Sequence, residues 1–199
     1  MTSRTTLTGL APLLPRTPHR GQLEPVSVST VKALPVLVAE GIRLREVDAS
    51  DATALTTLFR RPEVSRHLDP PPATVDDFGT WIALSRSRRA DGRAACYTLI
   101  TGEDEVSGLF MALRLDDHRR AEIGFAMAPH LWGTGVFRKA IDAYLEFLFS
   151  QWGVSELIGK TQVRNNRAMG AMRKVGAKVI EQAERNGNLE YIWTIERKD

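Results

Sequence analysis

The sequence contains one cysteine and four histidines in 199 residues, and no apolar run comes near the roughly 20 residues that cross a bilayer. Cys96 alone cannot form an intramolecular disulfide or a multi-cysteine metal site, and the scattered histidines lack metal-ligand spacing. A net charge of +3 is too small to predict a nucleic-acid-binding surface. We therefore expect a cytoplasmic, soluble protein with a reduced thiol and without a metal, a membrane contact or a nucleic-acid partner.

The first 40 residues differ from the rest of the chain. They contain no acidic residue before Glu24 and are rich in serine, threonine and proline. Pro12 and Pro15 break the short apolar stretch at residues 10–14, which argues against a signal peptide, and the prolines disfavour the amphipathic helix of a transit peptide. We interpret residues 1–40 as an N-terminal extension and residues 41–199 as one domain.

After residue 41, apolar residues follow strand and helix periods in turn. The patterns predict strands at 42–47, 95–101, 106–115, 120–128, 156–163, 178–184 and 189–196, and helices at 50–61, 74–89, 135–152 and 165–174. Thr74 and Asp77 form a capping box, and Asn186-Gly187 is a strong hairpin signal. This order predicts an α+β fold with a mixed sheet of about seven strands and four helices.

The loop at residues 127–137 joins a strand to the longest helix. Gly133 and Gly135 lie one residue apart at the start of that helix, where backbone N–H groups and the positive helix end can bind a phosphate or pyrophosphate. Neither a Walker A motif nor a dinucleotide fingerprint fits, because the loop lacks the Lys-Ser/Thr pair and the third glycine. Taken alone, the two glycines are more typical of a simple tight turn.

A second motif follows at the expected distance. Residues 165–177 resemble the N-x-x-S/A…K-x-G-F/A helix of GNAT-type N-acetyltransferases, and residues 132–137 resemble their acetyl-CoA loop. The P-x-x-W-G-x-G form resembles the ribosomal-protein N-terminal acetyltransferase (RimJ/RimL-like) branch. The resemblance covers residues 41–197 and implies the GNAT acyl-CoA N-acyltransferase fold. It also implies acetyl transfer from acetyl-CoA to a primary amine, either a protein N-terminus or a small amino compound.

The resemblance assigns the cofactor site residue by residue. The pantetheine arm is expected along the backbone of one strand and the pyrophosphate at the glycine loop, with a freed N–H near Met127 stabilising the oxyanion. The implied cofactor-binding residues are Phe125, Ala126, Met127, Trp132, Gly133, Thr134, Gly135, Val136, Phe137 and Asn165. Phe137 stands where the family usually has glycine or alanine, and helical spacing places it in the core with Ile141 and Tyr144.

Glu122 is the candidate base, because it lies on the cofactor strand and a partly buried glutamate has a raised pKa. The alternative is a strand residue paired with Arg120 or Arg114. Met172 occupies the position of the tyrosine acid of many relatives, and Ala168 that of a frequent serine. Tyr97 and Tyr191 are therefore the remaining acid candidates, whereas Tyr144 and Cys96 are expected to be core residues.

Three questions stay open at this level. A catalytically inactive acyl-CoA-binding sensor is the main alternative to an enzyme. A ribosome- or RNA-associated protein could use the basic tail with Arg86, Arg88 and Arg89, although a solvated helix end explains these arginines more simply. The acceptor is not encoded in any motif, and a homodimer is compatible with the sequence.

Overall fold

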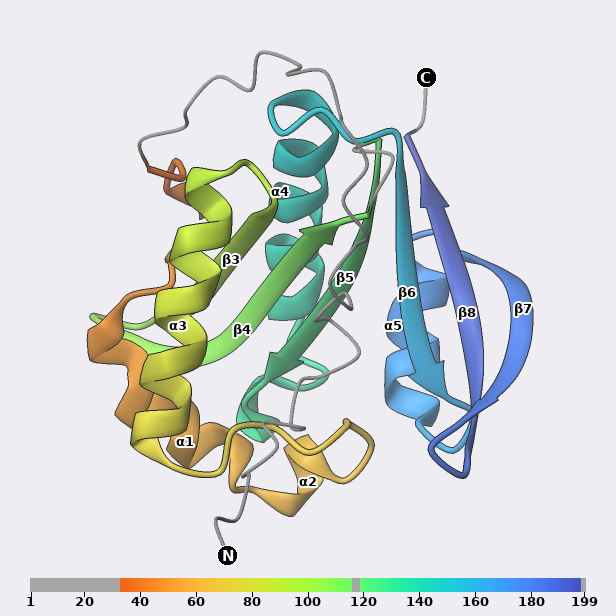
Figure 1. Cartoon of the computed structure of the whole chain (residues 1–199), viewed down its shortest axis with the longest axis horizontal. Helices are drawn as coiled ribbons and strands as arrows, with labels where there is room; N and C mark the ends of the chain where they lie inside the picture. Colours follow the sequence, from red (N-terminus) through yellow and green to blue (C-terminus); the bar gives the residue numbers. More distant parts are fainter. Residues whose placement is uncertain (1–32, 116–118, 198–199) are drawn as a thin grey trace, which may run out of the picture.

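The computed structural model describes residues 33–115 and 119–197, which form one mixed sheet covered by helices (Figure 1). The sheet has eight strands in the order β1-β2-β3-β4-β5-β6-β8-β7. All neighbouring strands are antiparallel except β5 and β6, which are parallel. The strands are β1 Leu37–Ala39, β2 Ile42–Glu46, β3 Ala94–Thr101, β4 Glu105–Arg114, β5 Arg120–Met127, β6 Glu156–Gln162, β7 Lys178–Arg185 and β8 Asn188–Glu196.

The helices cover both faces of the sheet. They are α1 Ala52–Phe59, α2 Pro62–Ser65, α3 Val75–Ala90, α4 Val136–Ser150 and α5 Asn166–Lys174. In Figure 1, α1 and α3 lie in front of β3 and β4, whereas α4 and α5 lie behind the sheet. The mixed α+β architecture expected from the sequence is confirmed, with one more strand and one more helix than the patterns predicted.

The local signals in the sequence act as expected at helix starts. Thr74 Oγ1 accepts from the Asp77 N–H at 3.1 Å and Asp77 Oδ2 accepts from the Thr74 N–H at 3.2 Å, which completes the capping box of α3. Pro62 ends the first helical segment and also begins α2, since a proline in the first turn lacks only an N–H that the helix does not use.

β1 lies inside the segment that the sequence analysis assigned to the extension. It pairs with β2, with Leu37 opposite Leu44, and Leu34 before it is buried. The Leu34 N–H also donates to Glu46 Oε2 at 3.2 Å. A strand of three residues is too short to show an alternation of apolar and polar residues, so no pattern in the sequence indicated β1. The expected domain boundary at residue 41 therefore cuts β1 off from the sheet to which it belongs.

The core centres on aromatic residues between α4 and the sheet. The Tyr97 ring packs against Tyr144 and Phe147 with centroid distances of 5.6 and 5.5 Å, and the Tyr144 hydroxyl donates to the Ala95 carbonyl at 2.7 Å. Burial raises the pKa of Tyr97, and it raises the pKa of the Cys96 thiol to about 12. Tyr144 and Cys96 are core residues as expected, whereas Tyr97 is wrong as an acid candidate because it is fully buried.

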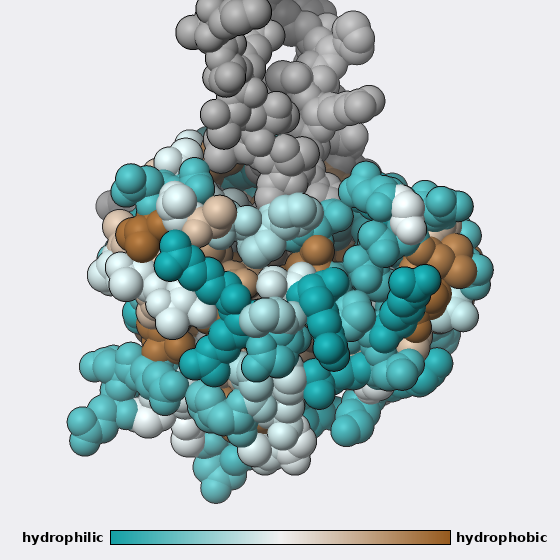
Figure 2. Space-filling view, turned by 90° about the horizontal axis from the view of Figure 1, so that it is seen from below, coloured by the Kyte–Doolittle hydropathy of each residue, from teal (hydrophilic) through white to brown (hydrophobic). Residues whose placement is uncertain are grey.

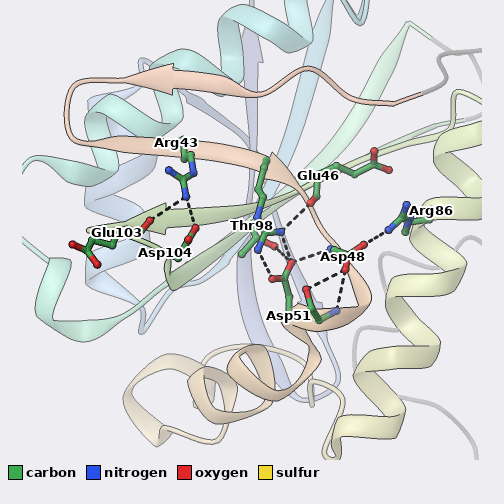
Figure 3. Close-up of polar contacts among 10 residues, drawn as sticks. Arg43, Glu46, Asp48, Asp51, Arg86, Thr98, Glu103 and Asp104 are labelled. Carbon is green, nitrogen blue, oxygen red and sulfur yellow. Dashed lines mark hydrogen bonds and ion pairs between the residues drawn. The ribbon is translucent and has the colours of Figure 1, made fainter.

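A polar network fixes the start of α1 to the sheet (Figure 3). Asp51, which is 1% exposed, accepts from Arg45 at 2.6 and 2.8 Å and from Thr98 Oγ1 at 2.8 Å. Burial alone would raise the pKa of Asp51, but these bonds and the Asp48 N–H outweigh burial and hold it below its usual value.

The arginine cluster at the end of α3 is part of the same region. Arg86 pairs with Asp48, and Arg89 Nε pairs with Glu46 Oε1 at 2.8 Å. Both carboxylates stand at the end of β2 or directly after it. Arg86 therefore lies at the surface, as expected for a solvated helix end, with its side chain 43% exposed, whereas the Arg89 side chain is only 14% exposed and paired.

Candidate active site

The parallel strands β5 and β6 separate halfway along their length. Residues 120–123 of β5 pair with residues 156–159 of β6, and the ladder between these two strands ends at Ile123 and Gly159. Beyond that point each strand keeps only its outer neighbour, β4 or β8. The structure thus has a fork that opens toward the carboxyl ends of β5 and β6, near α2 (Figure 1).

The fork leaves backbone groups of β5 without a strand partner. The Ala128 N–H donates to the Ser107 carbonyl at 2.8 Å, and the Leu115 N–H donates to the Arg120 carbonyl at 2.9 Å. Because antiparallel ladders alternate, the even-numbered residues of β5 direct their backbone toward β4. Phe125 and Met127 therefore direct theirs toward the fork, where an extended ligand can bind by adding to the strand.

A cavity of about 400 Å³ occupies the fork. Of the cofactor-binding residues expected from the sequence, it is lined by Phe125, Ala126, Met127, Trp132, Gly133, Phe137 and Asn165. Thr134, Gly135 and Val136 are part of the adjoining loop and helix start but do not line the cavity, and neither does Glu122. The structure thus gathers most of the expected set on one wall and places the base candidate outside it.

Two walls of the cavity were missed at the sequence level. The side near α2 is formed by Glu63, Val64, His67 and Leu68, and α5 adds Asn166, Arg167, Ala168, Gly170, Ala171 and Lys174. The α5 residues lie inside the motif that was recognised, so that motif could have indicated them. The α2 residues follow no motif, because their position depends on how the chain returns across the sheet.

The glycine loop has the backbone that the anion-site hypothesis requires. Gly133 and Gly135 have φ values of +81° and +88°, and Gly135 is the N-cap of α4. Other residues rarely adopt this conformation, and nothing lies within 4 Å of a Cβ built at either position. The loop therefore leaves open space above Gly133 and Gly135 at the positive end of a 15-residue helix, whereas the Thr134 and Val136 N–H groups donate at 3.4 Å to the Leu131 carbonyl and to Thr134 Oγ1.

Trp132 fixes this loop to both walls. Its indole Nε1 donates to the Met127 carbonyl at 3.1 Å, and the Arg167 guanidinium lies 3.5 Å above the ring. The cation–π contact joins the loop to α5 across the cavity. It also holds a positive charge beside the loop, which suits an anionic ligand.

Phe137 is only half-buried and lies between the core and the cavity. Its ring contacts Phe125 at 4.8 Å and Phe110 at 6.4 Å between centroids, and it lines the cavity. The expectation that it points into the core with Ile141 and Tyr144 is therefore only partly right. In the first turn of α4 the side chain rests on strands beside the fork, so it remains in contact with the open space.

Asn165 has a structural role in addition to lining the cavity. Its Oδ1 accepts from the Ala168 N–H at 3.1 Å and so caps α5. Tyr191, the remaining acid candidate, lies on β8 with its ring against Trp193 at 6.0 Å, and it is not among the cavity residues.

Glu122 lies on β5 one residue before the last β5–β6 pair. Its side chain is 12% exposed, and Oε2 accepts from Lys160 Nζ at 2.6 Å. Burial raises the pKa of Glu122, and the Lys160 ammonium opposes this effect in part. The ion-pair partner of Glu122 is therefore Lys160 on the neighbouring strand, and not Arg120 or Arg114 as the sequence suggested.

The segment after α2 crosses the ends of β6 and the β7–β8 hairpin. His67 Nδ1 lies 3.3 Å from Gln162 Oε1, and Asn186 Nδ2 donates to Asp69 Oδ1 at 3.2 Å. These contacts hold the segment after α2 against the ends of β6 and the β7–β8 hairpin. The end of the molecule that carries α2 in Figure 1 faces the viewer in Figure 2, where hydrophilic side chains surround small apolar patches.

Within residues 33–115 and 119–197, no group of three or more histidine, cysteine, aspartate or glutamate side chains could hold a metal ion. No helix in the same ranges is both long and apolar enough to cross a membrane. The cavity lining includes the aromatic rings of Phe125, Trp132 and Phe137, the cations of Arg167 and Lys174, and the Glu63 carboxylate.

Comparison with known proteins identifies relatives of this arrangement. The family model of the acetyltransferase (GNAT) domain matches residues 42–178. The uncharacterised N-acetyltransferase p20 of Bacillus licheniformis is 26% identical over 132 residues, which cover 65% of this chain and 74% of that protein.

Solved structures share the fold at low sequence identity. The acetyltransferase of Salmonella typhimurium that modifies the N-terminal serine of a 50S ribosomal subunit protein superposes with a TM-score of 0.74 at 16% identity, covering 82% of this chain and 100% of that one. A ribosomal α-N-protein acetyltransferase in complex with coenzyme A gives a TM-score of 0.73 at 17% identity, covering 81% and 98%.

Proposed function

Because this chain belongs to the acetyltransferase (GNAT) family, we propose that the cavity in the β5–β6 fork holds acetyl-CoA and that Glu122 accepts the proton of the acceptor amine. The chain is an acetyl-CoA-dependent N-acetyltransferase. Its residues must therefore hold the cofactor, remove a proton from the amine and select the acceptor.

The fork is the observation that supports this assignment most strongly. The backbone groups of Phe125 and Met127 have no strand partner on the fork side, and a pantetheine arm carries amide groups that can pair with them. The pyrophosphate then binds at the N–H groups of the loop at residues 133–135 and the start of α4. Arg167, held over Trp132, adds positive charge beside the phosphates.

An ammonium group cannot attack a thioester, so the acceptor must lose a proton. Glu122 accepts that proton, directly or through a water molecule, while the amine nitrogen forms a bond to the thioester carbonyl carbon. The Met127 N–H stabilises the oxyanion, a contribution of roughly 3–4 kcal/mol for a donor of this kind. The C–S bond then breaks, the nitrogen gives up its second proton to water, and water passes a proton to the departing coenzyme A thiolate, whose thiol form has a pKa of about 8.5.

The acceptor is a primary amine that enters from the α2 side. Glu63 and His67 line that side, and the glycine loop closes the other with phosphate-binding groups. Both a peptide N-terminus and a small amine meet the chemical requirement. The fold neighbour that modifies an N-terminal serine makes a peptide beginning with serine the first acceptor to test.

A panel assay tests the proposal. The full chain with acetyl-CoA is incubated with peptides that begin with serine or alanine and with small primary amines. Thiol release and a mass increase of one acetyl group on the acceptor are measured. We expect both signals with at least one amine. A folded protein that binds coenzyme A and releases no thiol with any amine would instead favour an acyl-CoA sensor.

A further inference from the structure

Lys160, which belongs to no motif in the sequence, forms an ion pair with Glu122 at the fork. We propose that Lys160 is a positioning residue that keeps Glu122 ionised and holds one of its oxygens, so that the second oxygen is available to the acceptor amine. The inference rests on the role of Glu122 as base proposed above. It concerns a contact between β5 and β6 that forms where the two strands separate.

The position of Lys160 follows from the register of the fork. Gly159 is the last residue of β6 that pairs with β5, and Lys160 is the next residue along the strand. Glu122 pairs with Ile158, and side chains two residues apart share a face, so Lys160 and Glu122 lie on the same side of the sheet. From there the lysine side chain reaches back along β6 to the Glu122 carboxylate.

The geometry of the pair is that of a charge-assisted hydrogen bond. Lys160 Nζ lies 2.6 Å from Glu122 Oε2, and the two side chains are 21% and 12% exposed. Within residues 33–115 and 119–197, Oε1 accepts no hydrogen bond. The ammonium thus holds the carboxyl group through Oε2. Oε1 is left to take a proton from the amine substrate.

Charged groups outside β5 and β6 also act on Glu122. Arg185 on β7 favours its ionised form, and Asp69 from the segment after α2 opposes it. Glu190 on β8 is coupled to the same groups and also has a raised pKa, chiefly because of burial. Arg185 is exposed, so solvent screens its charge, whereas the buried contact with Lys160 is screened little.

The consequence is that Lys160 favours the ionised form of Glu122, the form that can act as a base. Burial is the largest effect on this carboxyl and raises its pKa. Without the ammonium, burial and Asp69 would raise this pKa further, and a protonated carboxyl cannot accept the amine proton. A purely structural ion pair would stabilise the fold without setting the pH dependence of catalysis.

The first test measures the titration of Glu122 directly. The full chain is labelled with ¹³C at glutamate carboxyl groups, and the Glu122 signal is assigned with Glu122→Gln. Lys160→Gln retains a hydrogen-bond donor without the charge and should raise the midpoint by about 1–3 pH units, the usual effect of removing an adjacent opposite charge. Lys160→Arg should leave the midpoint within about half a pH unit, because the charge remains.

A matched control comes from the same sheet. Lys178 and Glu196 form a pair at 4.0 Å whose side chains are 76% and 66% exposed, far more than the pair at the fork. Lys178→Gln should not shift the Glu122 signal. Should Lys160→Gln fail to fold, Lys160→Met provides a second neutral variant of similar length, and thermal unfolding with coenzyme A checks that each protein retains its binding site.

The second test is the pH dependence of kcat, with saturating acetyl-CoA and a peptide with an N-terminal serine as the probe. The acid limb of kcat reports groups in the enzyme–substrate complex. In Lys160→Gln this limb should move to higher pH by the same amount as the NMR midpoint. At a pH on the acid limb, kcat should fall about tenfold for each pH unit that the limb moves. The Lys160→Arg limb should stay in place.

The outcomes separate this inference from the proposal on which it rests. An unshifted or lowered Glu122 midpoint in Lys160→Gln overturns the role of Lys160, even where Glu122→Gln is inactive and Glu122 remains the base. A Glu122→Gln enzyme with the kcat profile of the parent removes Glu122 as the base, and the proposed role of Lys160 then fails with it. A shift of both the midpoint and the acid limb supports the inference.

Discussion

Gly159 and Met172 meet at the point where β5 and β6 separate. A Cβ on Gly159 would lie 2.6 Å from the Met172 methyl carbon, so any larger residue at this position requires the end of the Met172 side chain to move. Met172 is 1% exposed. The position that carries a tyrosine acid in many relatives is thus a packing residue here, and it fixes α5 behind the fork.

This contact predicts a coupled effect on stability. Gly159→Val should destabilise the fold by about 1–3 kcal/mol, because the added methyl groups overpack a filled site. In a Met172→Ala background the cost should be smaller, since the clashing group is gone. Urea unfolding of the four proteins measures the coupling. Gly79→Ala in α3, where nothing lies within 4 Å of a Cβ, is the control and should be neutral or stabilising.

The glycine loop predicts a charge effect on cofactor binding. Gly135→Asp should weaken coenzyme A binding at least about tenfold, or 1.4 kcal/mol, by placing a carboxylate at the pyrophosphate site. Gly135→Asn is the matched control, because it has the same shape and strain at φ +88° without the charge. Calorimetric titration of both proteins measures the difference. Equal affinities in the two variants would remove the anion site from this loop.

The half-buried position of Phe137 predicts that its deletion lowers the free energy of unfolding by less than the deletion of a core aromatic residue. Deleting a buried phenylalanine costs about 3–5 kcal/mol, and we expect about half of that for Phe137→Ala because its ring is half-buried. Phe78→Ala, at a fully buried position, should show the whole loss. Chemical unfolding gives both values. Coenzyme A affinity should change only for Phe137→Ala, since Phe78 does not line the cavity.

If Glu122 is the base, its replacement should lower kcat and leave cofactor binding unchanged. Glu122→Gln should lower kcat by about 10²–10⁴-fold with little change in the KM for acetyl-CoA, because the amide cannot accept a proton. The raised pKa of Glu122 means that kcat of the parent enzyme should fall as the pH drops through that pKa. The loss in the variant should shrink at high pH, where the amine is already neutral. A loss below about threefold at neutral pH would make Glu122 a structural residue.

The lowered pKa of Asp51 predicts that the free energy of unfolding depends on pH in the acid range. Its pKa is lowered in the folded state, so its ionised form stabilises the fold at pH values above the unfolded pKa. That contribution should be lost as the pH falls through the lowered folded pKa. Asp51→Asn should be less stable by about 1–3 kcal/mol at pH 7, and the difference should narrow at acid pH. Thermal unfolding from pH 7 down to strongly acid conditions measures it.

Local sequence was sufficient for most elements and for the backbone of the glycine loop at residues 133–135. The capping box at Thr74 and the glycines at 133 and 135 act through neighbouring backbone, so their signals are complete within a few residues. The same holds for the β7–β8 hairpin, whose Asn186 and Gly187 adopt positive φ. Two motifs in the correct order therefore identified the family before any tertiary contact was known.

Tertiary structure decided the partner of Glu122 and the far wall of the cavity. Lys160 is 38 residues from Glu122 in sequence, and the two meet only through the register of a parallel pair that has no local turn to set it. The α2 side, with Glu63 and His67, is placed by the path of the chain across the sheet. Such contacts arise from packing between distant segments, and the periodicity of a single segment carries no information about them.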